Sequence, residues 1–165
     1  MDIKAFFIGI SISLLFLSSC KNKSTPKVSI NKNNMSDKIQ KTDKEWQALL
    51  TPAQFHVLRE QGTEAPRSGE YDLHFENGTY CCAGCGTQLF ESNNKYDAHC
   101  GWPSFDKAIE GTIIYKEDTS LGRVRTEIIC AKCDGHLGHV FDDGPQDTTG
   151  KRYCVNSLSL KFEKE

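Results

Sequence analysis

The chain has 165 residues, with 20 basic and 22 acidic side chains, a formal net charge of −2 and 38% hydrophobic residues. This length suits one domain of ordinary size with appended segments, and the composition excludes disorder along the whole chain. The slightly acidic balance argues against a protein that binds nucleic acid, which needs a basic surface to displace counterions. The eight cysteines indicate metal binding, redox chemistry or disulfides.

The start of the chain reads as an export signal. Residues 5–17 (AFFIGISISLLFL) follow Lys4 and are too short to span a bilayer as a helix, which needs about 20 apolar residues. Residues 17–20 (LSSC) resemble a bacterial lipobox, in which the cysteine is lipidated and becomes the first mature residue. We therefore predict a lipoprotein signal peptide at 1–19 and a lipid anchor at Cys20 that holds the exported protein on a bacterial membrane. The alternative is an uncleaved anchor in which this cysteine is incidental.

The charge is distributed unevenly along the chain. Residues 20–44 contain seven lysines and two aspartates, whereas residues 45–165 contain 12 basic and 19 acidic residues. The stretch 20–41 is rich in Lys, Asn and Ser, and it has too little apolar surface to offset the entropy of ordering. We expect 20–41 to be a flexible basic tether and 42–165 to be one domain.

The domain is expected to begin with two short helices. Residues 42–45 (TDKE) and 51–54 (TPAQ) both carry a capping-box pattern, and the second places proline at the first helical position. Apolar residues follow each pattern at helical spacing, and Gly62 provides a stop signal.

Beyond these helices the patterns indicate strands. Asn77-Gly78 between LHFE and TYCC predicts a hairpin, and strands are predicted over residues 112–115, 123–129 and 153–162. The residues alone therefore predict a mainly antiparallel β fold with an N-terminal helical pair.

Two Cys-x-x-Cys motifs, 44 residues apart, predict a metal site. Each motif places two thiolates on one side of a tight turn, and two such turns supply the four ligands of a tetrahedral zinc ion. We predict one structural Zn²⁺ per chain, which would staple distant segments of the fold. Two disulfides or a redox dithiol pair are the alternatives. The four ligands are Cys82, Cys85, Cys130 and Cys133.

Three further cysteines remain once zinc and lipid are assigned. In the predicted strand at 153–162, the period of two places Cys154 on one face with Arg152 and Asn156. A guanidinium would lower the pKa of this thiol and suit it to be a nucleophile, although an inert buried cysteine remains the alternative. Cys100 stands in a loop and could meet a strand cysteine to form a disulfide.

Other residues near these cysteines suggest a pocket. Trp102 and Phe105 would offer an apolar wall, unless both belong to the ordinary core. His136 and His139 are not needed as zinc ligands, because four cysteines complete the shell. Two histidines in four positions, beside a glycine and near a spare thiol, favour a catalytic pocket over a structural role.

These motifs resemble the B-type methionine (R)-sulfoxide reductases, and the similarity covers about residues 43–162. It implies a mainly β fold of two antiparallel sheets, small and barrel-like or tent-like, with short N-terminal helices and a structural zinc site. It also implies an enzyme of protein repair under oxidative stress, which reduces the R epimer of methionine sulfoxide in proteins and peptides. The matching stretches are CAGCG (82–86), HCGWPSF (99–105), CAKCDGHLGHVFDDGP (130–145) and RYCVNSLSLKF (152–162).

The resemblance also implies roles for single residues. Cys154 would be the nucleophile that becomes a sulfenic acid, and Cys100 would resolve it as a disulfide that a thioredoxin-like dithiol then reduces. Trp102 would pack on the substrate methyl group. Cys81 departs from the family pattern, as an alternative resolving thiol, a shifted ligand or a small buried apolar residue. The residues that would place water and polarise the sulfoxide oxygen are His136, His139, Arg152 and Asn156.

Two other functions compete with this one. A zinc-stapled binding module without catalysis would retain its function without Cys154. A cysteine hydrolase would pair Cys154 with a histidine and form an acyl-enzyme without any reductant. We expect a monomer that does not bind nucleic acid.

Overall fold

The computed structural model describes residues 38–165, so the predicted signal peptide, Cys20 and most of the predicted tether lie outside the described residues. Lys38 Nζ donates to Asp134 at 2.7 Å, and the Ile39 N–H donates to the Lys132 carbonyl at 2.8 Å. Contacts with the domain therefore begin ahead of the boundary predicted at residue 42. No helix within residues 38–165 is long and apolar enough to cross a membrane.

Both predicted helices are present: α1 spans Asp43–Leu49 and α2 spans Pro52–Glu60. Each begins with a complete capping box, in which a threonine and the residue three positions later cap each other's backbone N–H. The end of α2 differs from the prediction, because Gln61 adopts the left-handed conformation with φ 58°. Gly62 is required for a different reason, since an added Cβ would stand 2.4 Å from the His56 ring.

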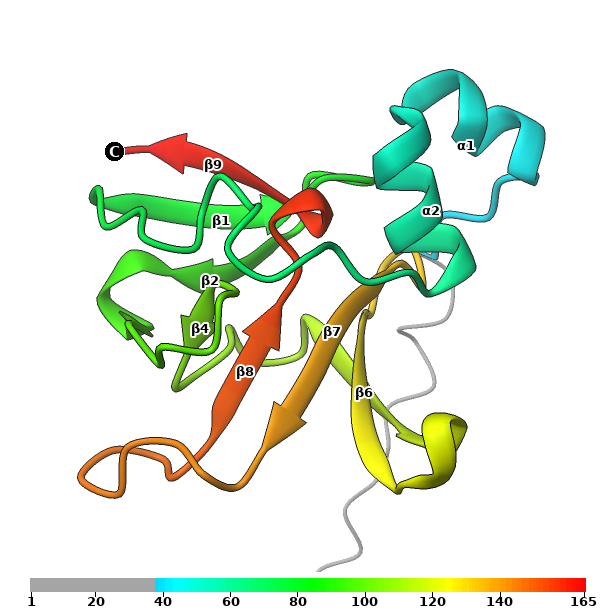
Figure 1. Ribbon diagram of the computed structural model, residues 1–165. Helices are drawn as coiled ribbons and strands as arrows, with labels where there is room; N and C mark the ends of the chain where they lie inside the picture. The colour runs from blue at the N-terminus through cyan, green and yellow to red at the C-terminus, as the bar shows by residue number, and fades with distance from the viewer. Residues whose placement is uncertain (1–37) are drawn as a thin grey trace, which may run out of the picture. The chain divides into compact units, whose positions relative to one another are not determined.

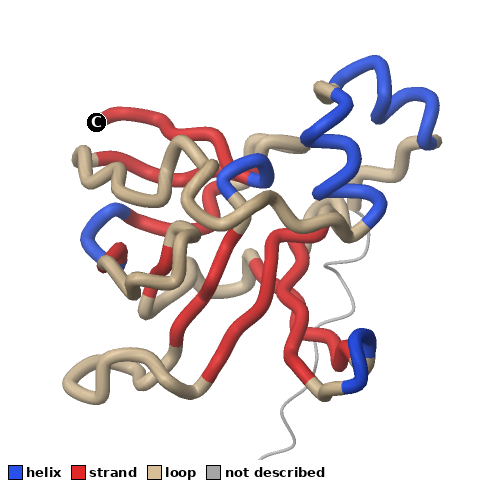
Figure 2. The backbone as a smooth tube through the Cα atoms, viewed as in Figure 1, coloured by secondary structure: helices blue, strands red, loops and turns tan. Residues whose placement is uncertain are grey.

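The rest of the domain consists of strands in two antiparallel sheets, as predicted (Figure 1). The smaller sheet has the order β2-β1-β9 and the larger has the order β3-β4-β8-β7-β6-β5. Figure 2 shows the helical pair in blue at one end of the strands, where α2 packs against β7. The strands are β1 (Gly78–Cys82), β2 (Gln88–Glu91), β3 (Lys95–Tyr96), β4 (Ser104–Phe105), β5 (Ile113–Asp118), β6 (Arg125–Cys130), β7 (His136–Phe141), β8 (Arg152–Val155) and β9 (Leu160–Lys164).

Three single turns of 3-10 helix connect these strands: η2 (Ser92–Asn94), η3 (Ser120–Gly122) and η4 (Ser157–Ser159). The last of them contradicts the single strand predicted over 153–162. Strand β8 ends at Val155, η4 turns the chain, and β9 continues in the other sheet.

The hairpin predicted at Asn77-Gly78 is also wrong. Strand β1 starts at Gly78 and pairs with β2 and β9, while the residues before it form no strand. His74, in that segment, packs its ring 4.4 Å from the Phe162 ring and hydrogen-bonds the Tyr80 hydroxyl. Tertiary packing of these aromatic rings outweighs the local turn preference.

Both sheets contribute side chains to one hydrophobic core. Phe105 on β4 is fully buried and stacks on Phe90 of β2, with 4.3 Å between ring centroids. The Tyr80 ring of β1 packs edge-on against the Phe105 ring, with 5.0 Å between the centroids. Since neighbouring residues on a strand face opposite ways, Ser104 points to the other face of the sheet, where its hydroxyl lies 3.3 Å from the Cys100 Sγ.

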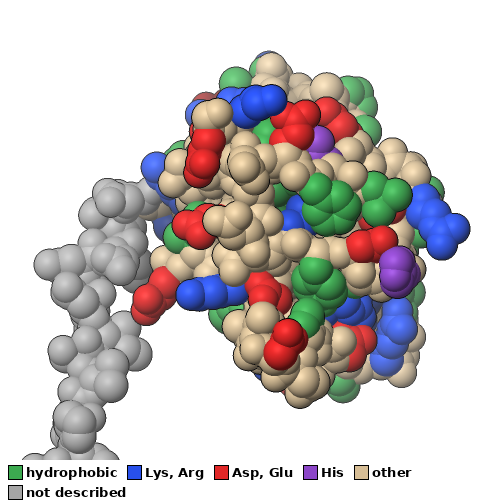
Figure 3. Space-filling model, turned by 90° about the vertical axis from the view of Figure 1, so that its left-hand side faces the viewer, with side chains coloured by type: hydrophobic (Ala, Val, Ile, Leu, Met, Phe, Trp, Pro, Cys, Tyr) green, Lys and Arg blue, Asp and Glu red, His purple; other side chains and the backbone are tan. Residues whose placement is uncertain are grey.

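The surface combines charges of both signs with a few large apolar side chains. Figure 3 shows one such face, where acidic and basic side chains are interspersed around hydrophobic ones. Two of the most exposed apolar residues, Leu121 and Val124, lie in the connection between β5 and β6. That connection borders the cavity that contains Cys154.

Candidate functional site

The four predicted zinc ligands lie together at the joined ends of the two sheets. Their sulfur atoms all lie within 4.8 Å of one another, and two of the separations are 3.6 Å. A tetrahedral ion with zinc–sulfur bonds of about 2.3 Å requires sulfur separations of about 3.8 Å. Cys82, Cys85, Cys130 and Cys133 are therefore positioned to hold one zinc ion.

Neighbouring residues hold this four-cysteine site in place. Arg59 of α2 donates to the Cys133 carbonyl at 2.9 Å and lies over the Trp46 ring at 5.1 Å. The hydrogen bond ties α2 to the second Cys-x-x-Cys motif, and the cation–π contact ties α2 to α1. Cys81, although adjacent to a ligand, is fully buried outside the cluster, and burial raises its pKa to about 11. It fits the interpretation as a small buried apolar residue.

The predicted nucleophile and resolving cysteine lie side by side. Cys154 is on β8, directly opposite Ser104 of β4 on one side and His139 of β7 on the other. Cys100 belongs to the loop before β4, and its Sγ lies 3.8 Å from the Cys154 Sγ and 3.3 Å from the Ser104 hydroxyl. Two thiols at this separation can form a disulfide after a small movement.

This contact shifts the pKa values of the two thiols in opposite directions. The hydrogen bond from Cys154 lowers the pKa of Cys100 to about 5, with further support from the Ser104 hydroxyl. The same contact, together with burial, raises the pKa of Cys154 above its ordinary range. These surroundings favour a thiolate on Cys100 over one on Cys154.

Arg152 affects Cys154 in the predicted direction but does not decide its charge. Its guanidinium lowers the pKa of Cys154, yet burial and the Cys100 thiolate outweigh that contribution. The reason is its placement: Arg152 forms two hydrogen bonds to Asp143, at 2.8 and 2.9 Å, and lies 4.4 Å from the Phe141 ring centre. Much of its charge is compensated there.

Cys154 opens into a cavity of about 310 Å³. The cavity brings four predicted residues together, Cys154, Trp102, His139 and Asn156, whereas Phe105 lies in the core instead. Ten residues line the cavity: Thr63, Trp102, Leu121, Arg123, Arg125, Gly138, His139, Phe141, Cys154 and Asn156.

Gly138 controls the backbone around Cys154. A Cβ at this position would stand 2.1 Å from the Cys154 carbonyl oxygen, so only glycine allows β7 and β8 to approach so closely. This approach sets His139 opposite Cys154 in the register.

Each predicted histidine has a carboxylate partner. His139 Nε2 lies 2.7 Å from Asp118, and His136 Nδ1 lies 2.6 Å from Glu127. Burial lowers the pKa of His136, which makes the neutral ring the stable form despite Glu127. Its Nδ1–H then donates to Glu127, and its buried Nε2 has no protein partner within residues 38–165. His136 lines a second cavity of about 640 Å³ that shares His139 with the first.

Asn156 is held by the protein on both sides of its amide. Its Nδ2 donates to the Leu137 carbonyl at 3.1 Å, and its Oδ1 accepts from the Glu64 N–H at 3.1 Å. These bonds fix the side chain in the cavity wall and leave one N–H of the amide for other contacts.

Sequence reasoning missed several residues of the site. Arg123 and Arg125 could have been found, because the period of two in the predicted strand 123–129 places them on one face. The same period places Glu127 on that face, whereas Thr63, Leu121 and Asp118 carry no comparable signal, since only the tertiary fold brings them to the site.

The four-cysteine site predicts a clear difference between replacing a metal ligand, Cys130, and replacing Cys81, which lies outside the site. Cys130→Ser should lose the metal and about 4 kcal/mol or more of unfolding free energy, because the ion holds distant segments together. Cys81→Ala should keep about one equivalent of zinc, since its thiol is no ligand. Elemental analysis and thermal unfolding of both variants provide the measurement. Retention of zinc by Cys130→Ser with wild-type unfolding would contradict the assignment.

The thiol pair predicts a titration that depends on Cys154. The thiolate is the charged form, so stabilising it lowers the pKa, and Cys100 should lose its charge only as the pH falls through about 5. Cys154→Ala removes the main stabilising hydrogen bond, and the midpoint should shift upward toward the ordinary value. Ultraviolet thiolate absorbance, measured with Cys81 replaced by alanine in both proteins, gives the midpoints. Equal midpoints in the two proteins would rule out this division of charge.

Comparison with known proteins identifies the family to which this arrangement belongs. The SelR domain family matches residues 50–164. Among solved structures, the "Yippee-like" domain of Mis18 gives a TM-score of 0.42 at 17% identity, covering 55% of this chain and 98% of that one, a likeness too low to support an argument.

Relatives from several bacteria share more than half of their residues with this chain. The peptide methionine sulfoxide reductase MsrB of Chromohalobacter salexigens is 56% identical over 129 residues, which cover 78% of this chain and 97% of the relative. The protein of the same name from Hahella chejuensis is 57% identical over 127 residues, 76% of this chain and 91% of the relative. The domain of this chain therefore belongs to the SelR family and is a close relative of the MsrB peptide methionine sulfoxide reductases.

Proposed function

We propose that this chain reduces the R epimer of methionine sulfoxide in proteins and peptides to methionine. The observation that carries the proposal is the pair of thiols 3.8 Å apart, one of which opens into a cavity with an indole, an imidazole and an amide. A side chain ending in a methyl sulfoxide fits such a cavity, because the indole can cover the methyl group and the polar groups can bind the oxygen.

The first step forms a bond between Cys154 sulfur and the sulfoxide sulfur. The proton of Cys154 passes to the Cys100 thiolate, which is 3.8 Å away, and this transfer produces the nucleophile. His139 lines the same cavity and is the group we propose as proton donor to the departing oxygen, with its ring held by Asp118. The protonated oxygen then passes from the methionine sulfur to the Cys154 sulfur as the bond between the two sulfurs breaks, so methionine leaves as the thioether and Cys154 becomes a sulfenic acid.

The second step closes a disulfide. The Cys100 sulfur attacks the sulfenic acid, water leaves, and a Cys100–Cys154 disulfide results. An external thioredoxin-like dithiol then reduces this disulfide and becomes oxidised itself, which returns both thiols. A zinc ion held by Cys82, Cys85, Cys130 and Cys133, away from the cavity, would have all four positions filled by thiolates and would supply rigidity to the fold.

The other candidate functions leave parts of this arrangement unexplained. A binding module has no need of two adjacent thiols that share one charge. A cysteine hydrolase needs the imidazole to accept the proton of Cys154, whereas its closest titratable partner by hydrogen bonding is Cys100.

We also propose that the protein is exported and anchored in a bacterial membrane through lipid on Cys20. The support lies in the sequence: the apolar stretch 5–17, the lipobox-like residues 17–20 and the lysine-rich segment after them. The reductant would then be a thioredoxin-like protein outside the cytoplasm, and the substrates would be oxidised proteins in the same compartment.

The two thiols should fail in different ways when replaced. Cys154→Ser should reduce no sulfoxide, because it lacks the sulfur nucleophile. Cys100→Ser should reduce about one equivalent per enzyme and then stop with a trappable sulfenic acid, because nothing resolves it. Loss of the Cys100 contact also removes the main cause that raises the pKa of Cys154, so the nucleophile can still form.

The assay follows both epimers of methionine sulfoxide separately with a dithiol donor, and Cys81→Ala is the matched control that should cycle normally. Reduction of the S epimer alone would refute the proposed stereochemistry. Full cycling of Cys100→Ser together with stalling of Cys81→Ala would assign the resolving role to Cys81.

The proposed anchor makes a second, independent prediction. Cells that express the full chain should yield membrane-bound protein labelled with fatty acid, whereas Cys20→Ala should abolish the label because the acylated sulfur is gone. The catalytic domain should remain active in both, since Cys20 lies outside the domain. Full-length unlabelled wild-type protein in the cytosol would exclude the anchor.

A further inference from the structure

Glu64 is a buried carboxylate that the proposed mechanism does not use. It lies after α2 with 9% of its surface exposed. Among residues 38–165, no lysine or arginine forms an ion pair with it, although other carboxylates do have such partners. Burying a carboxylate without a cation is costly, so its retention requires compensating hydrogen bonds.

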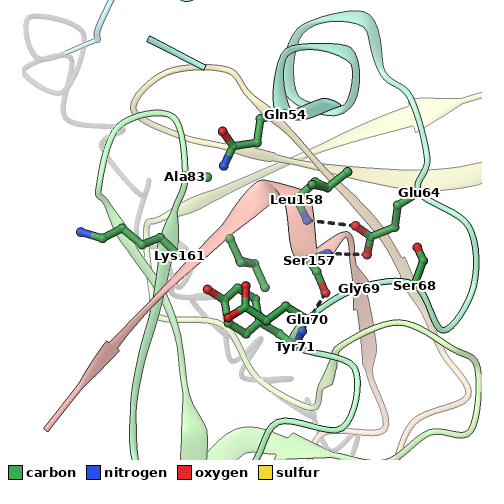
Figure 4. A pocket seen from close by; sticks show the side chains of 11 residues that line it. Gln54, Glu64, Ser68, Gly69, Glu70, Tyr71, Ala83, Ser157, Leu158 and Lys161 are labelled. Atoms are coloured by element: carbon green, nitrogen blue, oxygen red, sulfur yellow. Dashed lines mark hydrogen bonds between the residues drawn. The ribbon is translucent and has the colours of Figure 1, made fainter. Parts of the chain in front are cut away.

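The carboxylate finds these bonds at the start of η4 (Figure 4). Oε1 accepts from the Ser157 N–H at 2.6 Å, and Oε2 accepts from the Leu158 N–H at 3.0 Å. Asn156, the residue that precedes this turn, makes no capping hydrogen bond with its own side chain. Glu64 therefore satisfies from outside the N–H groups that a helical turn leaves free.

The backbone of Glu64 holds two residues of the cavity that contains Cys154. Its N–H donates to Asn156 Oδ1 at 3.1 Å, and its carbonyl accepts from the Trp102 indole N–H at 3.2 Å. One residue thus connects the loop that carries Trp102 to the turn that follows Cys154.

The space around this carboxylate is closely packed on one side. A Cβ on Gly69 would stand 2.6 Å from Glu64 Oε1 and 2.2 Å from the Ser157 hydroxyl. The same hydroxyl accepts from the Tyr71 N–H at 3.1 Å, which ties the neighbouring loop to η4. The carboxylate also borders a third cavity, of about 410 Å³, which shares no lining residue with the cavity at Cys154.

We propose that Glu64 is a positioning residue for the reduction of methionine sulfoxide. Its carboxylate fixes the turn after Asn156 while its backbone fixes Trp102, so the spacing between these two parts of the cavity wall depends on it. This inference rests on the proposed function, since it assigns Glu64 a role in placing the substrate of that reaction. Glu64 itself touches neither Cys154 nor Cys100 among the hydrogen bonds of the described residues.

Glu64→Gln tests this role with little change in shape. The amide keeps one acceptor oxygen but turns an NH₂ group toward a backbone N–H, so one of the two bonds to η4 is lost. Glu70→Gln is the matched control: Glu70 borders the same 410 Å³ cavity but is exposed.

The experiment measures single-turnover reduction of methionine (R)-sulfoxide by both variants and by wild type. For Glu64→Gln, we expect the half-saturating sulfoxide concentration to rise and the efficiency of the first step to fall about tenfold. The NMR resonance of the Trp102 indole N–H should also shift, a change that a residue important only for stability would not cause. Glu70→Gln should match wild type in both measurements.

The outcomes separate this inference from the proposed function. Wild-type kinetics and an unmoved indole resonance in folded Glu64→Gln would overturn the positioning role while the enzyme activity stands. An inactive wild type would overturn the proposed function itself. If Glu64→Gln does not fold, Glu64→Asp replaces it, because the shorter carboxylate keeps the charge but cannot reach both N–H groups, and the same shifts are expected.

Discussion

The site depends on one constraint: two thiols must stay close enough to share a proton and later a bond. Their 3.8 Å separation joins a loop to a central strand, and neither segment sets it alone. Strand β8 is fixed by β4 on one side and by β7 on the other, and Gly138 allows β7 to approach without a side chain in between. The loop with Cys100 is fixed at its far end by β4, whose Phe105 is anchored in the aromatic core.

The zinc cluster acts on this geometry from a distance. The second Cys-x-x-Cys motif ends at Cys133, and β7 starts three residues later at His136. A metal ion bound there would therefore fix the start of the strand that carries both histidines. The first Cys-x-x-Cys motif begins at Cys82, the last residue of β1. Strand β1 pairs with β9, the strand that follows η4. One ion held at this site would therefore restrain the chain before the histidines and, through the pairing of β1 with β9, after the turn that follows Cys154.

The sequence predicted those features that local patterns encode. Both capping boxes, the mainly antiparallel sheets and the four metal ligands are present, because a short motif is enough to specify each of them. The break between β8 and β9 was missed, since the residues from Tyr153 to Phe162 alternate like a continuous strand. The turn between the two strands is held by hydrogen bonds to Glu64, which is far away in the chain and therefore invisible to any local pattern.

The sequence also does not reveal which neighbouring groups set the pKa of Cys154. The sequence suggested that Arg152 activates Cys154, yet the guanidinium is paired with Asp143 and the neighbouring thiol has the larger effect. His139 likewise has its own carboxylate, and His136 is paired with Glu127. With the charge of Arg152 compensated by Asp143, the contact between the two sulfurs has the larger effect, and it favours a thiolate on Cys100 over one on Cys154. In the proposed mechanism Cys100 therefore takes part twice: its sulfur, 3.8 Å away, accepts the proton of Cys154 in the first step and resolves the sulfenic acid in the second.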